Sequence, residues 1–537
     1  MPKLTIDNRE VTVRAGATVL DAAREAGIRI PTLCYYDGLP PQTSCLVCAV
    51  RVQGLKRLVP ACAFPVREGM VVESETPEVH GARRTALELL MGDHLGDCVG
   101  PCVSICPTKM DIPRLMAHLK AGRPASALSA AKEMMALPAI LGYICPAPCE
   151  NGCRRALVDE TVSIRLMHRY AAEADLASGA PYLPVCAPAG AAGTAAVRTA
   201  GVSPASGRKV AIVGAGPAGL SAAWYLLQQG HACFIFDDRD EPGGQLRYSI
   251  DQAKLPRAAL DGEIAGIAKL GAQFRMKQKL GAAFSLEELR RDHAAVLLAP
   301  GEVSKETAAA LGLELAGKAL KAHGHIVSGK LDGVFAAGAA LVPGRMAVRS
   351  VANGRSAALA IGQFLAGVPI APAKEFVIHM GKLEPQELQI LMAGVNPGPR
   401  LKIGPEQQCT PEQAATESSR CLQCGCLKEH DCRLRQYAAE YGVQAAKYKG
   451  ERRKFERNTE HPQVVVERGK CIACGQCVQI TGQSSEALGL TYIGRGFDVR
   501  IGVPFNGKLV SALGNKAAEC AMACPTAAIA PREKKLK

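Results

Sequence analysis

The chain has 537 residues, a net charge of +14, 22 cysteines and a single tryptophan. This length predicts roughly three or four domains. The N-terminal segment lacks the apolar stretch of a signal peptide and no apolar run is long enough to span a membrane, so we expect a cytoplasmic protein without a transmembrane segment. In that reducing compartment, so many cysteines favour metal ligation over disulfides. The positive charge is spread along the chain without interleaved aromatic residues, which argues against nucleic-acid binding.

Residues 1–75 predict a small ferredoxin-like domain. The segment LTIDNREVTVRAG alternates as a β-hairpin does, and ATVLDAAREAG is typical of a short helix. Four cysteines follow with the spacing C-x10-C-x2-C-x13-C, and they are Cys34, Cys45, Cys48 and Cys62. Four such thiolates suit a 2Fe–2S cluster, with a structural zinc site as the alternative. The domain resembles the N-terminal 2Fe–2S domain of the complex I iron–sulfur subunit and of multi-subunit hydrogenases, which implies a β-grasp fold.

Residues 76–183 predict a helical domain with two further cysteine groups. A helix that begins at Thr76-Pro77 leads into HLGDCVGPCVSICP, and a later helical stretch leads into CPAPCENGC. The candidate ligands in these segments are His94, Cys98, Cys102, Cys106, Cys145, Cys149 and Cys153.

The two groups resemble the N-terminal domain of the glutamate synthase small subunit and of dihydropyrimidine dehydrogenase. In that family each of two 4Fe–4S clusters takes cysteines from both groups. The resemblance implies one cluster on Cys98, Cys102 and Cys153 and a second on Cys106, Cys145 and Cys149. Each cluster is then one ligand short.

Two histidines are candidates for the missing ligands. His94 precedes Cys98 by four residues, as in a His-x3-Cys ligation of the complex I subunit that it resembles. His168 stands where the glutamate synthase family has Gln or Glu in a helix of the pattern VxIxxLE. Imidazole nitrogen can bind iron and would raise the reduction potential relative to thiolate. For both histidines the alternative is an ordinary core or surface residue.

Residues 184–207 are rich in Ala, Gly, Pro and Ser and predict a linker, in which Cys186 has no partner. Residues 208–372 predict a Rossmann-like domain. KVAIVGAGPAGL is typical of a strand, a glycine turn and a helix, a turn that lets the backbone approach a pyrophosphate at the helix N-terminus. A carboxylate at the end of the next strand would accept hydrogen bonds from a ribose. The candidate nucleotide-binding residues here are Gly214, Gly216, Pro217, Ala218, Gly219, Asp237 and Asp238.

The following segment EPGGQLRYSIDQAKLPRAAL resembles the flavin domain of the glutamate synthase family, as do the segments that end at Gly301 and begin before Gly338. This resemblance implies bound FAD, with contacts from Gly243, Gly244, Gln245, Leu246, Gly301, Gly338 and Ala339.

The chain departs from that family at two places. Where the family inserts a complete NADPH domain, only residues 302–337 separate the two flavin segments. One βαβ unit takes about 30 residues or more, so we expect no NAD(P)H site in this interval. Ala339 replaces the aspartate that bonds the flavin ribityl chain in the family. This replacement removes a hydrogen bond worth roughly 1 kcal/mol, so we expect weaker FAD binding.

Residues 373–460 predict a helical segment with a third set of cysteines. Four thiolates fall within twelve residues, and they are Cys421, Cys424, Cys426 and Cys432. The other cluster motifs favour a 4Fe–4S cluster, with a zinc knuckle as the alternative. Cys409 is isolated, and we do not expect it to be a ligand.

Residues 461–537 resemble a bacterial ferredoxin, through the segments KCIACGQCVQIT and CAMACPT. In two-cluster ferredoxins three cysteines of one run share a cluster with the Cys-Pro cysteine of the other run. The resemblance implies one 4Fe–4S cluster, held by Cys471, Cys474, Cys477 and Cys524. Thr481 occupies the place of the next cysteine, so the second site is dismantled and Cys520 is its remnant or an alternate ligand.

The predicted fold is therefore multidomain, α/β and α+β, with FAD, one 2Fe–2S and four 4Fe–4S clusters. The sequence shows no catalytic side-chain pattern of its own. Clusters carry single electrons and a flavin accepts two, so this combination indicates an electron-transfer subunit.

We expect the subunit to relay electrons between an NADH-oxidising flavoprotein and a hydrogenase, formate dehydrogenase or ferredoxin, in a complex whose capacity for bifurcation the sequence leaves open. One alternative is a self-sufficient NAD(P)H oxidoreductase of the glutamate synthase type. Another is a cluster scaffold with a vestigial flavin site.

Overall fold

The computed structural model describes residues 1–184, 207–329, 331–344, 346–372, 374–404, 406–448, 450–451, 454–483 and 488–532. The predicted linker, with Cys186, lies almost entirely outside the described residues. The chain forms two compact units that alternate along the sequence. The first unit comprises Met1–Gly100, Lys374–Ala393 and Cys424–Lys537, and the second comprises Pro101–Ala373 and Gly394–Gln423.

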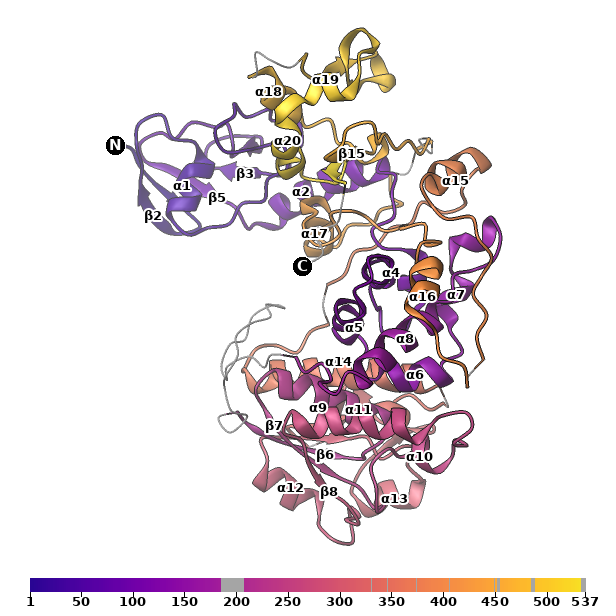
Figure 1. The fold of residues 1–537 in the computed structure, drawn as a ribbon. Coiled ribbons are helices and arrows are strands. Elements are labelled where there is room, and N and C mark those ends of the chain that lie inside the picture. Colours follow the sequence, from indigo (N-terminus) through magenta and orange to yellow (C-terminus); the bar gives the residue numbers. More distant parts are fainter. Residues whose placement is uncertain are drawn as a thin grey trace. The chain divides into compact units, whose positions relative to one another are not determined.

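The first unit begins with a five-stranded sheet in the order β2-β1-β5-β3-β4 (Figure 1). The strands are β1 (Lys3–Ile6), β2 (Arg9–Thr12), β3 (Ala49–Val52), β4 (Val59–Pro60) and β5 (Met70–Glu73). Asp7 and Asn8 both have positive φ, which gives the tight turn of the predicted β1–β2 hairpin. A capping box between Thr18 and Asp21 begins helix α1 (Val19–Glu25).

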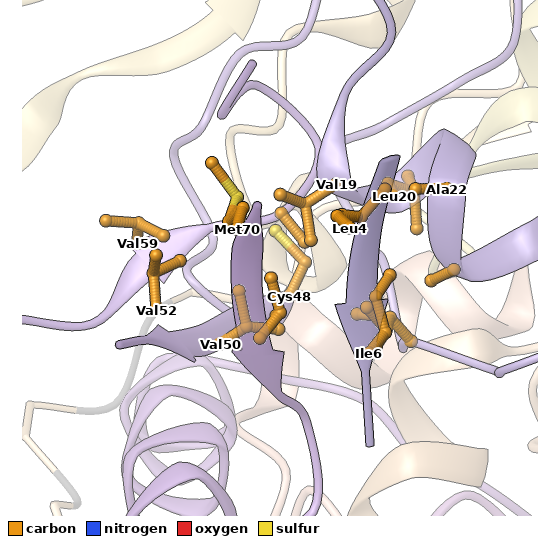
Figure 2. Packing of buried hydrophobic residues seen from close by; sticks show 14 of the residues in the cluster. Leu4, Ile6, Val19, Leu20, Ala22, Cys48, Val50, Val52, Val59 and Met70 are labelled. Atoms are coloured by element: carbon orange, nitrogen blue, oxygen red, sulfur yellow. The ribbon is translucent and has the colours of Figure 1, made fainter. Parts of the chain in front are cut away.

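Helix α1 packs its apolar side chains on this sheet. Figure 2 shows Val19 and Leu20 of the helix beside Leu4 and Met70 of the strands, with the Cys48 side chain among them. The mixed pairing, with β1 parallel to β5 and antiparallel to β2, gives the β-grasp-like sheet that the sequence indicates.

Short elements complete the first unit. Its helices are α2 (Pro77–Gly92), α15 (Pro385–Met392), α17 (Arg433–Glu440), α18 (Gln476–Gly482), α19 (Leu509–Leu513) and α20 (Ala517–Ala523). Two antiparallel pairs join β15 (Val464–Val466) to β18 (Ile529–Pro531) and β16 (Thr491–Ile493) to β17 (Arg500–Gly502). The Thr76 hydroxyl accepts the Val79 amide at 3.2 Å and caps α2, as its sequence predicts.

The second unit opens with a helical part. Its helices are α3 (Pro101–Ile105), α4 (Ile112–Lys120), α5 (Pro124–Lys132), α6 (Pro138–Ile144), α7 (Pro148–Asn151), α8 (Ile164–Leu176) and α16 (Pro411–Ser418). Proline begins most of them because it has no N–H to leave unpaired in the first turn.

A seven-stranded sheet in the order β12-β13-β14-β9-β6-β7-β8 forms the rest of the second unit (Figure 1). Its parallel strands are β6 (Lys209–Val213), β7 (Ala232–Phe236), β8 (Gln273–Arg275), β9 (Ala295–Leu298) and β14 (Val334–Ala336). Their connections hold helices α9 (Pro217–Gln228), α10 (Gln245–Tyr248), α11 (Arg257–Lys269) and α12 (Leu286–Asp292), and α14 (Ala347–Leu365) follows β14. This parallel, helix-connected sheet confirms the predicted Rossmann-like class.

The interval between Gly301 and Gly338 contains only short elements. Before β14 it contains α13 (Lys305–Ala310) and the strands β10 (Leu315–Ala316), β11 (Ala319–Leu320), β12 (Ala322–His323) and β13 (Ile326–Val327). The last two extend the main sheet in antiparallel fashion. Among the described helices, none is both long and apolar enough to cross a membrane.

Candidate metal and nucleotide sites

The four cysteines of the N-terminal domain are all buried and lie together. The thiols pair, Cys34 with Cys45 and Cys48 with Cys62. The hydrogen bond from Cys45 lowers the pKa of Cys34 to about 5, and the one from Cys62 lowers the pKa of Cys48. The same contacts raise the pKa of the partner thiols Cys45 and Cys62. Four buried cysteine sulfurs that lie together are the donor set of a 2Fe–2S cluster.

A second site lies in the C-terminal part of the first unit. One cavity is lined by Cys471, Cys474, Cys477 and Cys524, the four residues that the ferredoxin resemblance implies. Apolar side chains such as Ile472 and Leu490 line the rest of it. The amide of Ala473 points at Cys471 Sγ at 3.4 Å, and such N–H groups stabilise anionic sulfur.

Thr481 takes a structural role where a second ferredoxin site would have its cysteine. Its hydroxyl donates to the Cys477 carbonyl at 2.8 Å and accepts the Leu490 amide at 2.9 Å. Cys520 is buried, does not line the cavity, and has its Sγ 3.9 Å from the Cys477 carbonyl oxygen. The geometry therefore favours Cys524 over Cys520 as the ligand.

A third site of the first unit is a cavity that gathers residues far apart in the sequence. His94, Cys98, Cys426 and Cys432 line it, with Lys470 and Arg435 beside them. The Cys426 amide donates to the Cys98 carbonyl at 3.4 Å. Among the described residues, His94 Nδ1 is buried without a hydrogen-bond partner. Burial, together with the Lys470 ammonium, lowers the pKa of His94 to about 3, so its imidazole is neutral near pH 7.

This cavity departs from the grouping that the family resemblance implies. That grouping joins Cys98 to Cys102 and Cys153, whereas the structure places Cys98 beside Cys426 and Cys432. The boundary between the two units falls between Cys98 and Cys102. These two cysteines therefore belong to different units although they are close in the sequence.

In the second unit, Cys106, Cys145 and Cys149 lie close to one another, as the resemblance implies. Burial raises the pKa of the Cys145 and Cys149 thiols, and the neighbouring Cys106 raises both further. Ala147 has positive φ between two of these cysteines, and its amide points at Cys145 Sγ at 3.4 Å.

His168, the fourth candidate ligand for this group, lies on α8 and is buried. Its Nδ1 is 3.0 Å from the carbonyl oxygen of Pro138, at the start of the helix that ends at Cys145. Burial lowers the pKa of His168 to about 4. A neutral ring that donates Nδ1–H to this carbonyl leaves Nε2 unprotonated, which is the usual state of a metal-binding histidine.

Cys102, Cys153 and Cys421 also belong to the second unit, whereas Cys424 belongs to the first. The segments that carry Cys153 and Cys421 are adjacent, because the Arg155 guanidinium donates to the Arg420 carbonyl at 3.1 Å.

The cysteine loops share a backbone feature that the sequence does not reveal. Leu46, Ala147, Gln423 and Ala473 each lie between two candidate cysteine ligands, and each has a φ between 51° and 53°. A non-glycine residue in this left-handed region is strained, and such strain concentrates at functional sites. The conformation turns the loop back so that sulfurs on both sides can face one centre.

The glycine turn after β6 has the shape that a dinucleotide needs. Gly214 has a φ of +112°, and a Cβ there would lie 2.1 Å from the Ala299 carbonyl oxygen. A Cβ on Gly219 would lie 1.9 Å from the Gly214 oxygen. At Gly216, in contrast, an added Cβ would meet open space. Two of the glycines thus serve packing, and the third leaves room beside the helix N-terminus.

Asp237, which directly follows β7, is hydrogen-bonded to this turn. Its Oδ2 accepts the Ala215 amide at 2.6 Å, and its Oδ1 accepts the Arg239 amide at 3.0 Å. Asp238, the neighbouring candidate, is exposed. Asp237 is therefore the carboxylate positioned for a ribose.

The predicted flavin segment packs on the same turn. Gly243 and Gly244 have positive φ, and the Gly243 amide donates to the Ala215 carbonyl at 2.9 Å. Gln245 and Leu246 begin the short helix α10.

Gly338 lies next to the N-terminal half of α9. Its amide donates to Asn353 Oδ1 at 2.6 Å, and its missing Cβ would lie 2.8 Å from the Ala218 Cβ. Sequence reasoning missed Asn353, because α14 carries other polar residues such as Arg349 and Ser356 and Asn353 does not stand out among them. Ala339 is half-buried in a short 3-10 turn, and Gly301 has positive φ with open space around it.

Family models match three parts of the chain. Residues 2–77 match a 2Fe-2S iron-sulfur cluster binding domain, and residues 96–180 match dihydropyrimidine dehydrogenase domain II with a 4Fe-4S cluster. Residues 212–273 match an NAD(P)-binding Rossmann-like domain. These matches confirm the predicted domain classes, and the third indicates a dinucleotide site without specifying which dinucleotide.

The chain is similar to subunits of several oxidoreductases. It is 39% identical over 205 residues, 36% of this chain and 28% of the relative, to the NADP(+)-dependent formate dehydrogenase subunit beta of Moorella thermoacetica. It is 48% identical over 94 residues, 18% of this chain and 11% of the relative, to an NADH-quinone oxidoreductase subunit of Rhizobium meliloti. The glutamate synthase small chain of Bacillus subtilis is 31% identical over 198 residues, which is 36% of each protein. The chain thus covers less than half of each relative, and the resemblance to the glutamate synthase small chain is confirmed.

Proposed function

We propose that this chain is an iron–sulfur flavoprotein subunit that relays electrons within a cytoplasmic multi-subunit oxidoreductase. One terminal would be an NADH-oxidising flavoprotein, and the other a hydrogenase, a formate dehydrogenase or a ferredoxin. Similarity to a formate dehydrogenase beta subunit and to an NADH-quinone oxidoreductase subunit supports this assignment.

The observation that carries the proposal is a shared core in the first unit. Cys34, Cys432 and Cys474 come from three different cysteine sites, yet they belong to one cluster of buried side chains. The Gln476 side chain also donates to the Leu33 carbonyl at 2.9 Å, which ties the first site to the second. Because electron transfer slows steeply with distance, cysteine sites that share one core are placed to exchange electrons.

The second unit supports a flavin at the junction. The glycine turn and Asp237 fit a dinucleotide, since Gly216 faces open space and a carboxylate lies at the end of the next strand. FAD, when bound, accepts two electrons together and releases them singly. The amides at the start of α9 would face its pyrophosphate, and Asp237 would accept the ribose hydroxyls.

The alternative of a self-sufficient NAD(P)H oxidoreductase finds less support. The interval in which the glutamate synthase family has its NADPH domain holds α13, four strands of two residues each and β14. This is too little chain for another dinucleotide-binding domain. We therefore propose that electrons from a nicotinamide reach this chain through a partner.

An anaerobic absorbance experiment tests the proposal. The purified chain should not bleach on addition of NADH or NADPH alone, and should bleach when an NADH-oxidising flavoprotein of the complex I type is added with NADH. Rapid bleaching by a nicotinamide without any partner would support the self-sufficient reductase. Absence of FAD in an extract of the denatured protein would support the cluster scaffold.

A further inference from the structure

The cavity around His94 combines residues from two of the ligand groups that the sequence suggests. We infer that His94, Cys98, Cys426 and Cys432 hold one 4Fe–4S cluster, which is assembled from two segments of the first unit that are far apart in the sequence. The inference deepens the proposed relay, because it defines the third cluster of the first unit. The inference can be wrong while the proposed relay is right, because a different grouping of the same cysteines would still conduct electrons.

The backbone around the cavity holds the two segments in register. The Cys98 amide donates to the Ile378 carbonyl at 3.0 Å, and its own carbonyl accepts the Cys426 amide at 3.4 Å. The Asp97 carboxylate accepts the Met380 amide at 2.9 Å. Cys98 and Cys426 are thus fixed as neighbours by main-chain contacts that do not depend on a metal.

Cys432 faces the same cavity from the N-cap of α17. The Arg435 amide points at its Sγ at 3.5 Å. A helix N-terminus presents N–H groups and the positive end of its dipole, and both stabilise a thiolate. Three buried cysteines therefore converge, each with its exposed fraction between 7% and 8%.

His94 supplies the fourth ligand atom. Its Nδ1 is buried in the cavity wall and has no hydrogen-bond partner among the described residues. A buried polar atom without a partner costs free energy, and a bound iron would satisfy it. Three thiolates and one imidazole complete the coordination of a 4Fe–4S cluster.

Charged side chains of both signs line the cavity. Lys470 Nζ lies 3.8 Å from Cys426 Sγ, and the Arg435 guanidinium is held by the carbonyls of Phe376 and Glu429. The cavity wall also contains the acidic residues Asp97 and Glu429. Glu467, which does not line the cavity, forms an ion pair with Lys470. The Lys470 ammonium is the charge shown beside a ligand sulfur, where it would offset part of the negative charge of the thiolates.

The grouping is tested with Cys98→Ser, Cys432→Ser and their double variant, purified anaerobically as full chains. If both cysteines hold one cluster, each single variant loses about four iron atoms and the same electron paramagnetic resonance signal, and the double variant loses no more. Cys409→Ser, which removes a cysteine outside all groups, should lose none. Cys153→Ser should lose a different signal.

A loss of about eight iron atoms in the double variant, or the same lost signal in Cys98→Ser and Cys153→Ser, would overturn the grouping. Loss of one zinc with no iron would overturn the cluster itself. All three results are read from metal content and spectra, so none of them depends on activity.

His94→Cys tests the histidine without removing the cluster. In the His168→Gln background, a chain that keeps His94 should give a strong nitrogen coupling in pulsed electron paramagnetic resonance. The His94→Cys variant should keep its iron and lose this coupling, while His80→Asn, a change at an exposed histidine paired with Glu75, leaves it in place. Persistence of the coupling in His94→Cys would exclude His94 as the ligand.

Discussion

The ammonium nitrogen of Lys470 lies 3.8 Å from the Sγ of Cys426, in the interior of the first unit. The same residue directly precedes Cys471, and its carbonyl accepts the Thr526 hydroxyl at 2.8 Å. Lys470 therefore lines the His94 cavity, and its carbonyl accepts a hydrogen bond from Thr526, which lines the Cys471 cavity. This connects two proposed clusters through one residue, which sequence reasoning missed although it adjoins a cysteine motif.

Replacing Lys470 by Met should lower the reduction potential of the cluster bound by Cys426. A positive charge beside the thiolates favours the reduced, more negative state, and Met removes that charge while keeping the chain length. We expect a fall on the order of 60 mV, which corresponds to about 1.4 kcal/mol for one electron. The measurement is a redox titration followed by electron paramagnetic resonance. Lys516→Met, at a lysine that pairs with Glu519, is the control and should leave the potential unchanged.

Gly216→Ala should separate FAD binding from folding. An added Cβ at Gly216 meets no protein atom within 4 Å, so the variant should keep its unfolding temperature and its iron. The methyl group would occupy the space that we assign to the pyrophosphate, so the FAD content should fall strongly. Gly219→Ala places a Cβ 1.9 Å from the Gly214 oxygen and should lower stability as well. Equal FAD content in Gly216→Ala and the wild type would contradict the assignment.

Ala339→Asp should tighten FAD binding. The change restores the side chain that bonds the ribityl chain in the glutamate synthase family. A gained hydrogen bond of about 1 kcal/mol corresponds to a roughly fivefold lower dissociation constant. Fluorescence titration of FAD into the flavin-depleted protein measures it, with Ala347→Asp as a control on the neighbouring helix. An unchanged constant would show that Ala339 does not face the flavin.

Stability should depend on pH through Glu263, which lies buried on α11. Its two carboxylate oxygens accept the amides of Ala139 and Ile140 at 3.0 Å each, at the start of the helix that carries Cys145 at its end. Burial raises the pKa of Glu263 to about 7, despite the opposing effect of Lys132 and these amides. The folded protein therefore binds the proton more tightly than the unfolded chain does.

The stability that the protonated Glu263 contributes is fully present below the ordinary glutamate pKa of 4.5. It is lost as the pH rises through the folded-state pKa of about 7. The loss amounts to about 3 kcal/mol over that window. Urea unfolding of the anaerobic holoprotein at pH 5.5 and pH 7 measures about half of this loss, roughly 1.5 kcal/mol. Glu263→Gln cannot titrate, so the difference between the two pH values should shrink. An identical pH dependence in the variant would refute the role of Glu263.

The sequence allowed the local parts of the fold to be predicted because they depend on short-range patterns. The hairpin at Asp7-Asn8, the cap at Thr76 and the strand–turn–helix around Gly214 all appear where the pattern indicates. The ferredoxin set of Cys471, Cys474, Cys477 and Cys524 likewise lines one cavity, since its spacing repeats a known loop.

The pairing of distant segments could not be predicted in this way. Spacing between neighbouring cysteines limits which of them can share a cluster, but it does not show which remote segment completes the set. The contact between Cys98 and Cys426 depends on the fold of the whole first unit, to which both ends of the chain contribute. The strain at Ala473 and the contact of Lys470 are also tertiary properties.

The central claim, that this chain is a conductor of electrons through several clusters, is tested most directly by its metal content. Iron and acid-labile sulfide should be determined on the anaerobically purified full chain, together with extracted FAD. We predict about eighteen atoms each of iron and sulfide, for one 2Fe–2S and four 4Fe–4S clusters, and about one FAD per chain. A protein that is nearly free of iron, or that holds zinc in its cysteine sites, would contradict the account.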